Sequence, residues 1–263
     1  MFNFCSLYSG SSGNSLFVET DKTKILIDCG VSGKKISEAL HNLDTSLEEI
    51  DAILVTHEHS DHIQSLGMLS KKYEIPVYVN YETLEAMPKQ KEKIDLINQK
   101  IFTIGKEFKI GDLCINSFSI PHDAANPCGF NIYNNKEKLT IATDLGHMNK
   151  NLLENMKGSK FILLESNYEP ELLQYSKYPY ILKQRISGPN GHLPNATAGQ
   201  TIGFLTKYDL KEVLLGHLSK ESNMPEIAYQ TVIEELHNNN IDTDELKIGV
   251  ANRDKISKLI KLC

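Results

Sequence analysis

Short apolar runs that end at Gly, Ser or charged residues open the chain and predict β-strands. These runs are Phe2–Tyr8, Ser15–Glu19 and Lys24–Asp28. From residue 31 the apolar spacing becomes that of amphipathic helices, which alternate with further strands. The predicted helices are Val31–Leu43 and Ile63–Tyr73, and the predicted strands are Asp51–Thr56 and Pro76–Val79.

The same order returns in the second half of the chain. A β-rich block comes first, with strands predicted at Lys100–Thr103, Glu107–Ile110, Leu113–Ile120, Cys128–Tyr133 and Lys138–Thr143. Alternation follows, with helices at Asn149–Asn155, Ala196–Leu205 and Pro225–Asn238 and strands at Phe161–Glu165, Glu212–Leu215 and Leu246–Gly249. Two similar halves, each a sheet with its helices outside, predict an α/β fold: a four-layer α/β/β/α sandwich. Because the sequence contains no low-complexity linker, we expect a single domain over residues 1–263.

Two stretches do not follow this alternation. Tyr81–Asn98 is polar and rich in Lys and Glu, which predicts a helical excursion at the surface. Tyr168–Asn195 contains four prolines among basic residues and is typical of an insertion beside a functional edge.

Composition excludes several classes of protein. The 28 Lys and Arg against 34 Asp and Glu leave a net charge of −6, which does not favour a nucleic-acid coat or a membrane-surface protein. The longest apolar runs are far shorter than a membrane span, and the N-terminus lacks the pattern of a secretory signal. Five widely spaced cysteines without a C-x-x-C pair indicate reduced thiols. We therefore expect a cytoplasmic protein that does not bind membranes, and its oligomeric state stays open.

The densest chemistry lies in His57-x-His59-x-Asp61-His62, directly after a predicted strand. His57 and His59 lie on the same side of an extended chain, so both imidazoles can reach one ion. Asp61 and His62, at the following turn, can face a second ion. Imidazole and carboxylate ligands suit zinc, manganese or iron. The alternative is a solvated polar loop at a strand end.

Three further candidate ligands each follow a predicted strand. They are His122, Asp144 and His217. Since strand ends at one edge of a sheet converge, these side chains are expected near the histidine motif. Taken singly, each histidine could instead be a hydrogen-bonded structural residue.

These residues, in this order, resemble the motifs of the metallo-β-lactamase superfamily. The nearer resemblance is to its YycJ/WalJ branch, of nuclease and phosphodiesterase type without an added β-CASP domain. The matching motifs are Ser9–Ser15, Pro121-His122-Asp123-Ala124-Ala125-x-Pro127, Glu165-Ser166-Asn167, Gly191-His192-Leu193-x-Asn195 and Gly216-His217-Leu218-Ser219.

The resemblance implies a site with two divalent metal ions. His57, His59 and His122 would hold one ion, Asp61, His62 and His217 the other, and Asp144 would bridge them. Asp28 would orient the metal loop, as ligating imidazoles need an acceptor behind them. Glu165 and Asn167, which end a buried strand, could support the site from behind.

Two residues are candidates for catalysis of phosphodiester hydrolysis. Asp61 would orient or deprotonate the attacking water, and His192 would protonate the leaving oxygen, because an imidazole exchanges a proton near neutral pH. The resemblance favours the same role for His192, whose alternative is a loop histidine without a catalytic part.

Substrate contacts are expected from three segments. Ser11, Ser12 and Asn14 lie in a Gly/Ser loop that could line an anion pocket, although such loops are often plain turns. Lys183 and Arg185, with Lys177 and nearby tyrosines, could form a basic aromatic groove or an ordinary solvated face. Asn195 belongs to the branch motif and completes the set.

The leading functional hypothesis is a phosphodiesterase or nuclease, a DNA exonuclease in particular, with DNA favoured over RNA as substrate. A thioester or lactone hydrolase using the same ions is the alternative. A redox diiron role is disfavoured because His59 stands where flavodiiron relatives usually carry glutamate. A binding module without catalysis is the remaining class.

Overall fold

The computed structural model describes residues 1–262, and these form two compact units. The first unit contains residues 1–119, 124–136 and the C-terminal residues from Asn252. The second unit contains Ile120–Asp123 and Glu137–Ala251. The expectation of a single domain stays a prediction, and each unit is described by itself.

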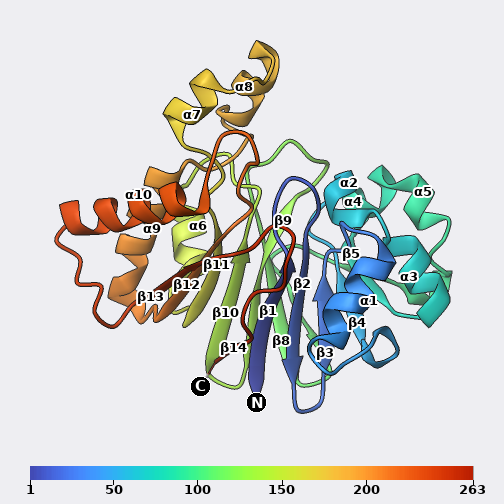
Figure 1. Ribbon diagram of the computed structural model, residues 1–263. Helices are drawn as coiled ribbons and strands as arrows, with labels where there is room; N and C mark the ends of the chain where they lie inside the picture. The colour runs from blue at the N-terminus through green and yellow to red at the C-terminus, as the bar shows by residue number, and fades with distance from the viewer. Residues whose placement is uncertain (263) are drawn as a thin grey trace. The chain divides into compact units, whose positions relative to one another are not determined.

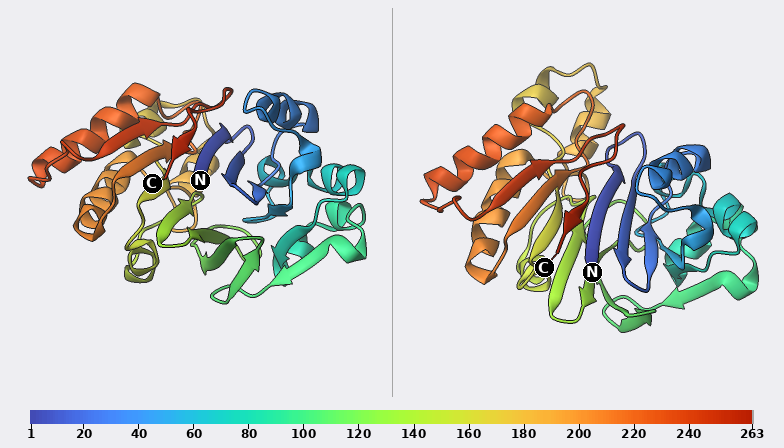
Figure 2. Two further views of the ribbon diagram at one scale, coloured as in Figure 1. Left: turned by 90° about the horizontal axis from the view of Figure 1, so that it is seen from below. Right: turned by 60° about the horizontal axis from the view of Figure 1, so that its bottom comes forward.

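A mixed sheet dominates the first unit, with strand order β14-β1-β2-β3-β4-β5-β6. The first three strands pair antiparallel, and β3 to β6 pair parallel. Its strands are β1 (Phe2–Tyr8), β2 (Ser15–Thr20), β3 (Lys24–Ile27), β4 (Ala52–Leu54), β5 (Val77–Asn80), β6 (Gln99–Phe102) and β14 (Ile260–Lys261). Figures 1 and 2 show the red β14 beside the blue β1, with which it pairs antiparallel. The two-residue β14 carries too little pattern to be predicted from sequence.

Helices follow the parallel strands of this sheet. They are α1 (Gly33–His41), η1 (Leu47–Glu49), α2 (Ser60–Ile63), α3 (Leu66–Tyr73), α4 (Tyr81–Ala86), α5 (Pro88–Lys91) and η2 (Leu96–Asn98). Apolar residues of α1 and α3 pack into one core with the strands, as Ile36, Leu69 and Ile53 show. The single helix predicted over 63–73 is divided, since α2 ends at Ile63 and α3 begins at Leu66.

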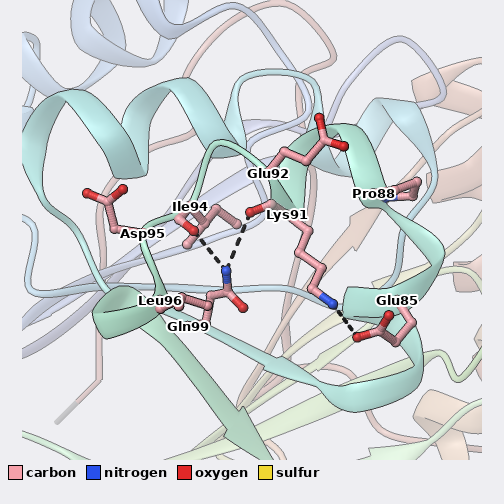
Figure 3. Close-up of a pocket in the computed structure, with 8 residues that line it drawn as sticks. All are labelled: Glu85, Pro88, Lys91, Glu92, Ile94, Asp95, Leu96 and Gln99. Atoms are coloured by element: carbon pink, nitrogen blue, oxygen red, sulfur yellow. Dashed lines mark hydrogen bonds and ion pairs between the residues drawn. The ribbon is translucent and has the colours of Figure 1, made fainter.

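The predicted surface excursion at residues 81–98 is helical. It surrounds a cavity of about 510 Å³ lined by Glu85, Pro88, Lys91, Glu92, Ile94, Asp95, Leu96 and Gln99 (Figure 3). Lys91 pairs there with Glu85, and Gln99 Nε2 donates to the Ile94 carbonyl at 2.8 Å. No histidine lines this cavity, so it is separate from the candidate chemistry.

Three antiparallel strands complete the first unit. They are β7 (Glu107–Ile110), β8 (Leu113–Ser119) and β9 (Cys128–Asn134). In β8, buried residues alternate with more exposed ones over Leu113–Ser117, the period-two pattern that the sequence predicts.

The second unit is built on four parallel strands in the order β10-β11-β12-β13. The strands are β10 (Glu137–Ala142), β11 (Phe161–Glu165), β12 (Glu212–Gly216) and β13 (Lys247–Val250). The helices are α6 (Lys150–Met156), α7 (Pro170–Tyr175), α8 (Tyr180–Ile186), α9 (Asn195–Leu205), η3 (Thr206–Tyr208) and α10 (Pro225–Asn238). Every residue of β11 is buried, as expected of a central parallel strand. Parallel strands bring their carboxyl ends to one edge, where the candidate ligands follow.

Within residues 1–262, no helix is long and apolar enough to cross a membrane. Cys5, Cys29, Cys114 and Cys128 are thiols rather than disulfides. Cys263 lies outside the described residues.

Candidate metal centre

In the first unit, three histidines gather at the carboxyl end of β4. The buried strand continues through Val55 and Thr56 into His57, which is fully buried, as is His62. The ring centroid of His57 lies 4.7 Å from that of His59 and 4.1 Å from that of His62. The spacing in the sequence therefore produces a compact cluster of imidazoles.

Asp28, at the end of the neighbouring strand β3, holds this cluster from behind. Its Oδ1 accepts the Thr56 backbone N–H at 2.9 Å, and its Oδ2 accepts the Thr56 hydroxyl at 2.7 Å. The same Oδ2 lies 2.7 Å from His62 Nδ1, which must be the donor because a carboxylate only accepts. Thr56 Oγ1 in turn lies 3.0 Å from His57 Nδ1 and can accept from it. Asp28 thus has the geometry of the anchor that the sequence predicts.

Asn14, in the Gly/Ser loop, packs against the same cluster. Its side chain accepts the Gly10 N–H at 2.9 Å and places Nδ2 at 3.0 Å from His62 Nε2. Its backbone N–H donates to the Asp61 carbonyl at 2.8 Å. Ser11 and Ser12, by contrast, are exposed. Asn14 therefore supports the histidine loop, and the two serines remain available to a substrate.

In the second unit, Asp144, Glu165 and His217 stand at the carboxyl ends of three adjacent parallel strands. With His192 they form a group in which one ligand atom from each residue lies within 4.8 Å of all the others. Nε2 of His122 is 3.6 Å from Asp144 Oδ1. The convergence of strand ends thus operates as expected within this unit.

Three residues of the two clusters share an unusual backbone. Asp28, Asp144 and His217 each follow a strand and adopt positive φ, of 61°, 60° and 55°. Residues with a Cβ seldom occupy this left-handed region, at a cost of about 1–2 kcal/mol. Such strain concentrates at functional sites, where surrounding contacts hold it.

Glu165 is the central acceptor of the second cluster. Its Oε1 accepts from His217 Nδ1 at 2.8 Å and from His192 Nδ1 at 2.9 Å. Its Oε2 accepts the backbone N–H groups of Leu145 and Leu193 at 2.6 and 3.2 Å. Burial opposes ionisation, but His192 and His217 outweigh it and lower the pKa of Glu165. The sequence indicated Glu165 only as support from behind, because a strand-end carboxylate does not reveal which distant histidines it will reach.

His122 is oriented by a backbone acceptor instead. Its Nδ1 lies 3.1 Å from the Gly191 carbonyl, to which it donates. Burial lowers the pKa of His122, and nearby Asp144 opposes this less strongly. His122 is therefore neutral near pH 7, the form in which an imidazole binds metal.

The donor atoms fit divalent metals. In His62, His122 and His217, Nδ1 is committed to an oxygen, so Nε2 is the nitrogen that can coordinate. The remaining candidate donors are the imidazoles of His57 and His59 and the carboxylates of Asp61 and Asp144, and the whole set is typical of zinc, manganese or iron. A metal on His62 would replace the Asn14 amide as the partner of Nε2.

His192 occupies a position between ligands. Its ring centroid is 5.3 Å from those of His122 and His217, and 18% of its side chain is exposed. With Nδ1 on Glu165, Nε2 remains for proton transfer. Nδ1 of the nearby His147 donates to the Pro189 carbonyl at 2.8 Å, and the Asn149 side chain caps α6.

The structure corrects the expected role of Asn195. This side chain is fully buried, and its Nδ2 donates to Glu169 and Asn223 while its Oδ1 accepts from Ser166 and Asn223. All of its polar capacity is used inside the protein, so it braces the loop rather than contacting substrate.

Two basic residues predicted to contact substrate have partners within the second unit. Arg185 binds Asp123 through two contacts of 2.5 and 3.1 Å, and Lys183 Nζ donates to the Gln174 carbonyl at 2.7 Å. Their role in phosphate binding stays a prediction.

Comparison with known proteins places the chain in a family. A model described as beta-lactamase superfamily domain matches residues 23–218. Exodeoxyribonuclease WalJ of Streptococcus pneumoniae is 38% identical over 237 residues, covering 89% of this chain and 88% of that protein. Exodeoxyribonuclease YycJ of Bacillus anthracis is 38% identical over 234 residues, covering 89% of each chain.

A solved structure of low sequence identity has the same fold. The metallo-beta-lactamase fold protein YhfI from Bacillus subtilis superposes with a TM-score of 0.70 at 14% identity, over 98% of this chain and all of that one. The predicted α/β fold class and the predicted resemblance are thus confirmed. The chain belongs to the beta-lactamase superfamily and has its metallo-β-lactamase fold.

Proposed function

We propose that this protein is a metal-dependent DNA exonuclease that hydrolyses phosphodiester bonds. The observation that carries the proposal is the set of buried, pre-oriented imidazole and carboxylate donors in a chain 38% identical to proteins named exodeoxyribonucleases. DNA is favoured over RNA because both relatives are named for activity on DNA. The expected cytoplasmic location is consistent with the thiols described above and stays a prediction.

We further propose that the candidate ligands hold two divalent ions, of zinc, manganese or iron. His57, His59 and His122 would hold one ion, Asp61, His62 and His217 the other, with Asp144 as the bridge. The ions would supply a water of lowered pKa and neutralise charge on the phosphoryl oxygens. The commitment of Nδ1 to fixed acceptors supports these roles.

The chain's own residues would manage the protons. Asp61, whose side chain is 27% exposed, would orient the attacking water. His192 would donate a proton from Nε2 to the leaving oxygen, because the ionised Glu165 at its Nδ1 stabilises the imidazolium until transfer. The exposed Ser11 and Ser12 would bind phosphate oxygens.

Metal analysis followed by digestion of end-labelled oligonucleotides tests the proposal. Protein purified without added metal should contain about two divalent ions per chain and shorten labelled DNA from an end. His59→Ala should abolish cleavage, and the exposed His237→Ala on α10 should not. Absence of DNA digestion together with turnover of acyl thioesters would replace the nuclease by the thioester-hydrolase alternative.

The role of His192 as the acid can be tested with two substrates whose leaving groups differ in their need for a proton. The p-nitrophenolate of bis-p-nitrophenyl phosphate leaves without protonation, whereas the deoxyribose oxygen of DNA requires it. His192→Ala should therefore reduce DNA cleavage by about 100-fold or more and cleavage of the nitrophenyl ester much less. Equal losses on both substrates would refute the acid role.

A further inference from the structure

Helices α7 and α8 form a hairpin that projects from the rest of the second unit (Figure 1). Tyr168, Leu173 and Ile186 make a small core of its own, against which Tyr178 and Leu182 pack. Lys183 on α8 ties the two helices together through the Gln174 carbonyl. The hairpin is thus held in a defined shape by its own apolar core and by a hydrogen bond between its helices.

The tip of this hairpin exposes large apolar and aromatic side chains. Tyr175 ends α7 and is 82% exposed, while Tyr180 and Ile181 begin α8 and are 72% and 80% exposed. Only residues 176–179 separate the helices, so these side chains lie at the same end. None of these three side chains belongs to the hairpin's core. Exposed apolar side chains that gather at one place are typical of a binding surface.

The hairpin has a charge opposite to that of the whole chain. Over residues 170–188, Lys177, Lys183 and Arg185 stand against Glu171 alone, which gives 3 − 1 = +2 in a chain of net charge −6. Lys177 lies in the connection at the tip and is exposed. Positive charge interleaved with exposed aromatic rings complements a nucleic-acid strand, whose phosphates are anionic and whose unpaired bases stack.

The other end of the hairpin leads directly into the candidate metal centre. Arg185, near the end of α8, donates two hydrogen bonds to the carboxylate of Asp123, the residue after His122. The Ile186 carbonyl accepts the His192 N–H at 2.8 Å, and the Gly191 carbonyl accepts from His122. A strand held at the tip could thus run along α8 to the residues proposed to act on it.

We propose that the tip of the α7–α8 hairpin binds unpaired nucleotides of the DNA substrate, with bases stacked on Tyr175 and Tyr180 and a phosphate near Lys177. This inference rests on the proposed function and specifies its substrate as single-stranded DNA or a frayed end. In a duplex each base face already stacks on its neighbours, so exposed rings bind unpaired bases selectively.

Ring substitutions test the inference by fluorescence anisotropy with a labelled single-stranded oligonucleotide in EDTA, which prevents cleavage. The double variant Tyr175→Ala/Tyr180→Ala should weaken binding by at least about tenfold, from the usual contribution of base stacking. Tyr175→Phe/Tyr180→Phe keeps both rings and should bind within about twofold of wild type. Tyr229→Ala, an exposed tyrosine of α10, is the control for position.

Three results would overturn the inference: unchanged affinity in the double alanine variant, full affinity in a Tyr175→Leu/Tyr180→Leu variant, or an equal loss on blunt duplex. The leucine result would mean that apolar contact, and not the stacking of bases on aromatic rings, holds the strand at the tip. The proposed function fails separately, if wild-type protein with metal digests no DNA. If the wild-type protein digests DNA but the double alanine variant binds the oligonucleotide unchanged, only the proposed binding at the hairpin tip is rejected.

Discussion

At the scale of single residues, the candidate centre depends on carboxylates that bind no metal themselves in our assignment. Asp28 holds His62 through Nδ1, and Glu165 holds His217 and His192 in the same way. Each carboxylate also accepts two further hydrogen bonds, which fix its own position. The imidazoles are therefore oriented before any ligand arrives.

Replacing Glu165 with Gln should weaken metal binding and activity by about 10- to 100-fold. Glutamine keeps one acceptor oxygen, but its NH₂ group must face either the imidazoles or the backbone N–H groups of Leu145 and Leu193. In either orientation a donor faces another donor, and those hydrogen bonds are lost. Metal titration and DNA digestion measure the effect. Glu221→Gln, an exposed site with the same chemical change, is the control. Full metal affinity in Glu165→Gln would contradict the orienting role.

The titration of His122 predicts how stability of the metal-free protein depends on pH. Burial lowers the pKa of His122 below its ordinary 6.5, so at mildly acidic pH the unfolded chain binds this proton more readily than the folded one. The free energy of unfolding should accordingly fall as pH decreases below 6.5. Urea denaturation in EDTA at a series of pH values tests this. In His122→Gln the fall should be smaller, and an identical fall in both proteins would contradict the assignment.

At the scale of elements, the histidine loop is held by close backbone contact among three segments. Gly30 N–H donates to the Asn14 carbonyl at 2.8 Å, and Asn14 N–H donates to the Asp61 carbonyl at 2.8 Å. A Cβ on Gly30 would lie 1.6 Å from the Asp61 carbonyl oxygen. Only glycine permits this approach.

Gly30→Ala should therefore destabilise the protein by about 3 kcal/mol or more and displace the metal-binding loop. Gly33→Ala, three residues on, is the matched control. Its Cβ would lie 2.6 Å from the end of the exposed, flexible Met68 side chain and 3.1 Å from Leu69 Cδ2, with no backbone atom in the way, so this variant should lose much less stability than Gly30→Ala. Thermal denaturation and metal content of both variants give the comparison. Equal stability of the two would show that the three-segment contact is unimportant.

Because Lys177 is exposed at the tip of the α7–α8 hairpin, we expect it to contribute to the electrostatic attraction of DNA. Lys177→Ala should reduce the salt dependence of single-stranded DNA binding by about 0.7 in the slope of log K against log salt. Arg185 should contribute less, since Asp123 already neutralises it. Binding measured across salt concentrations tests this against Lys207→Ala, an exposed lysine of η3. An unchanged slope in Lys177→Ala would place the phosphates elsewhere.

At the scale of the whole molecule, metal binding should add to the stability of the folded protein. Ligands that bind only the folded state stabilise it by mass action, by about 2.7 kcal/mol at a concentration 100 times the dissociation constant. Removing metal with EDTA should thus lower the melting temperature by roughly 5–10 °C and abolish DNA cleavage. Adding back zinc or manganese should restore both. A melting temperature indifferent to EDTA would contradict metal binding by the folded protein.

Local patterns in the sequence were sufficient for the fold class and for most strands and helices. Alternation and amphipathic spacing reflect which face of each element is buried, and this is encoded by neighbouring residues. The histidine motif and the three later candidate ligands each follow an apolar strand, which is why the sequence alone could single them out, and their role as ligands stays a prediction. The family membership that they suggested is confirmed.

Other features depend on contacts between residues far apart in the chain, and only the tertiary structure decided them. Glu165 reaches histidines 27 and 52 positions away, and β14 pairs with β1 from the opposite end of the chain. Asn195, a predicted substrate contact, is enclosed in an amide network. A hydrogen bond joins whichever groups packing brings within about 3 Å, and no local periodicity records that distance.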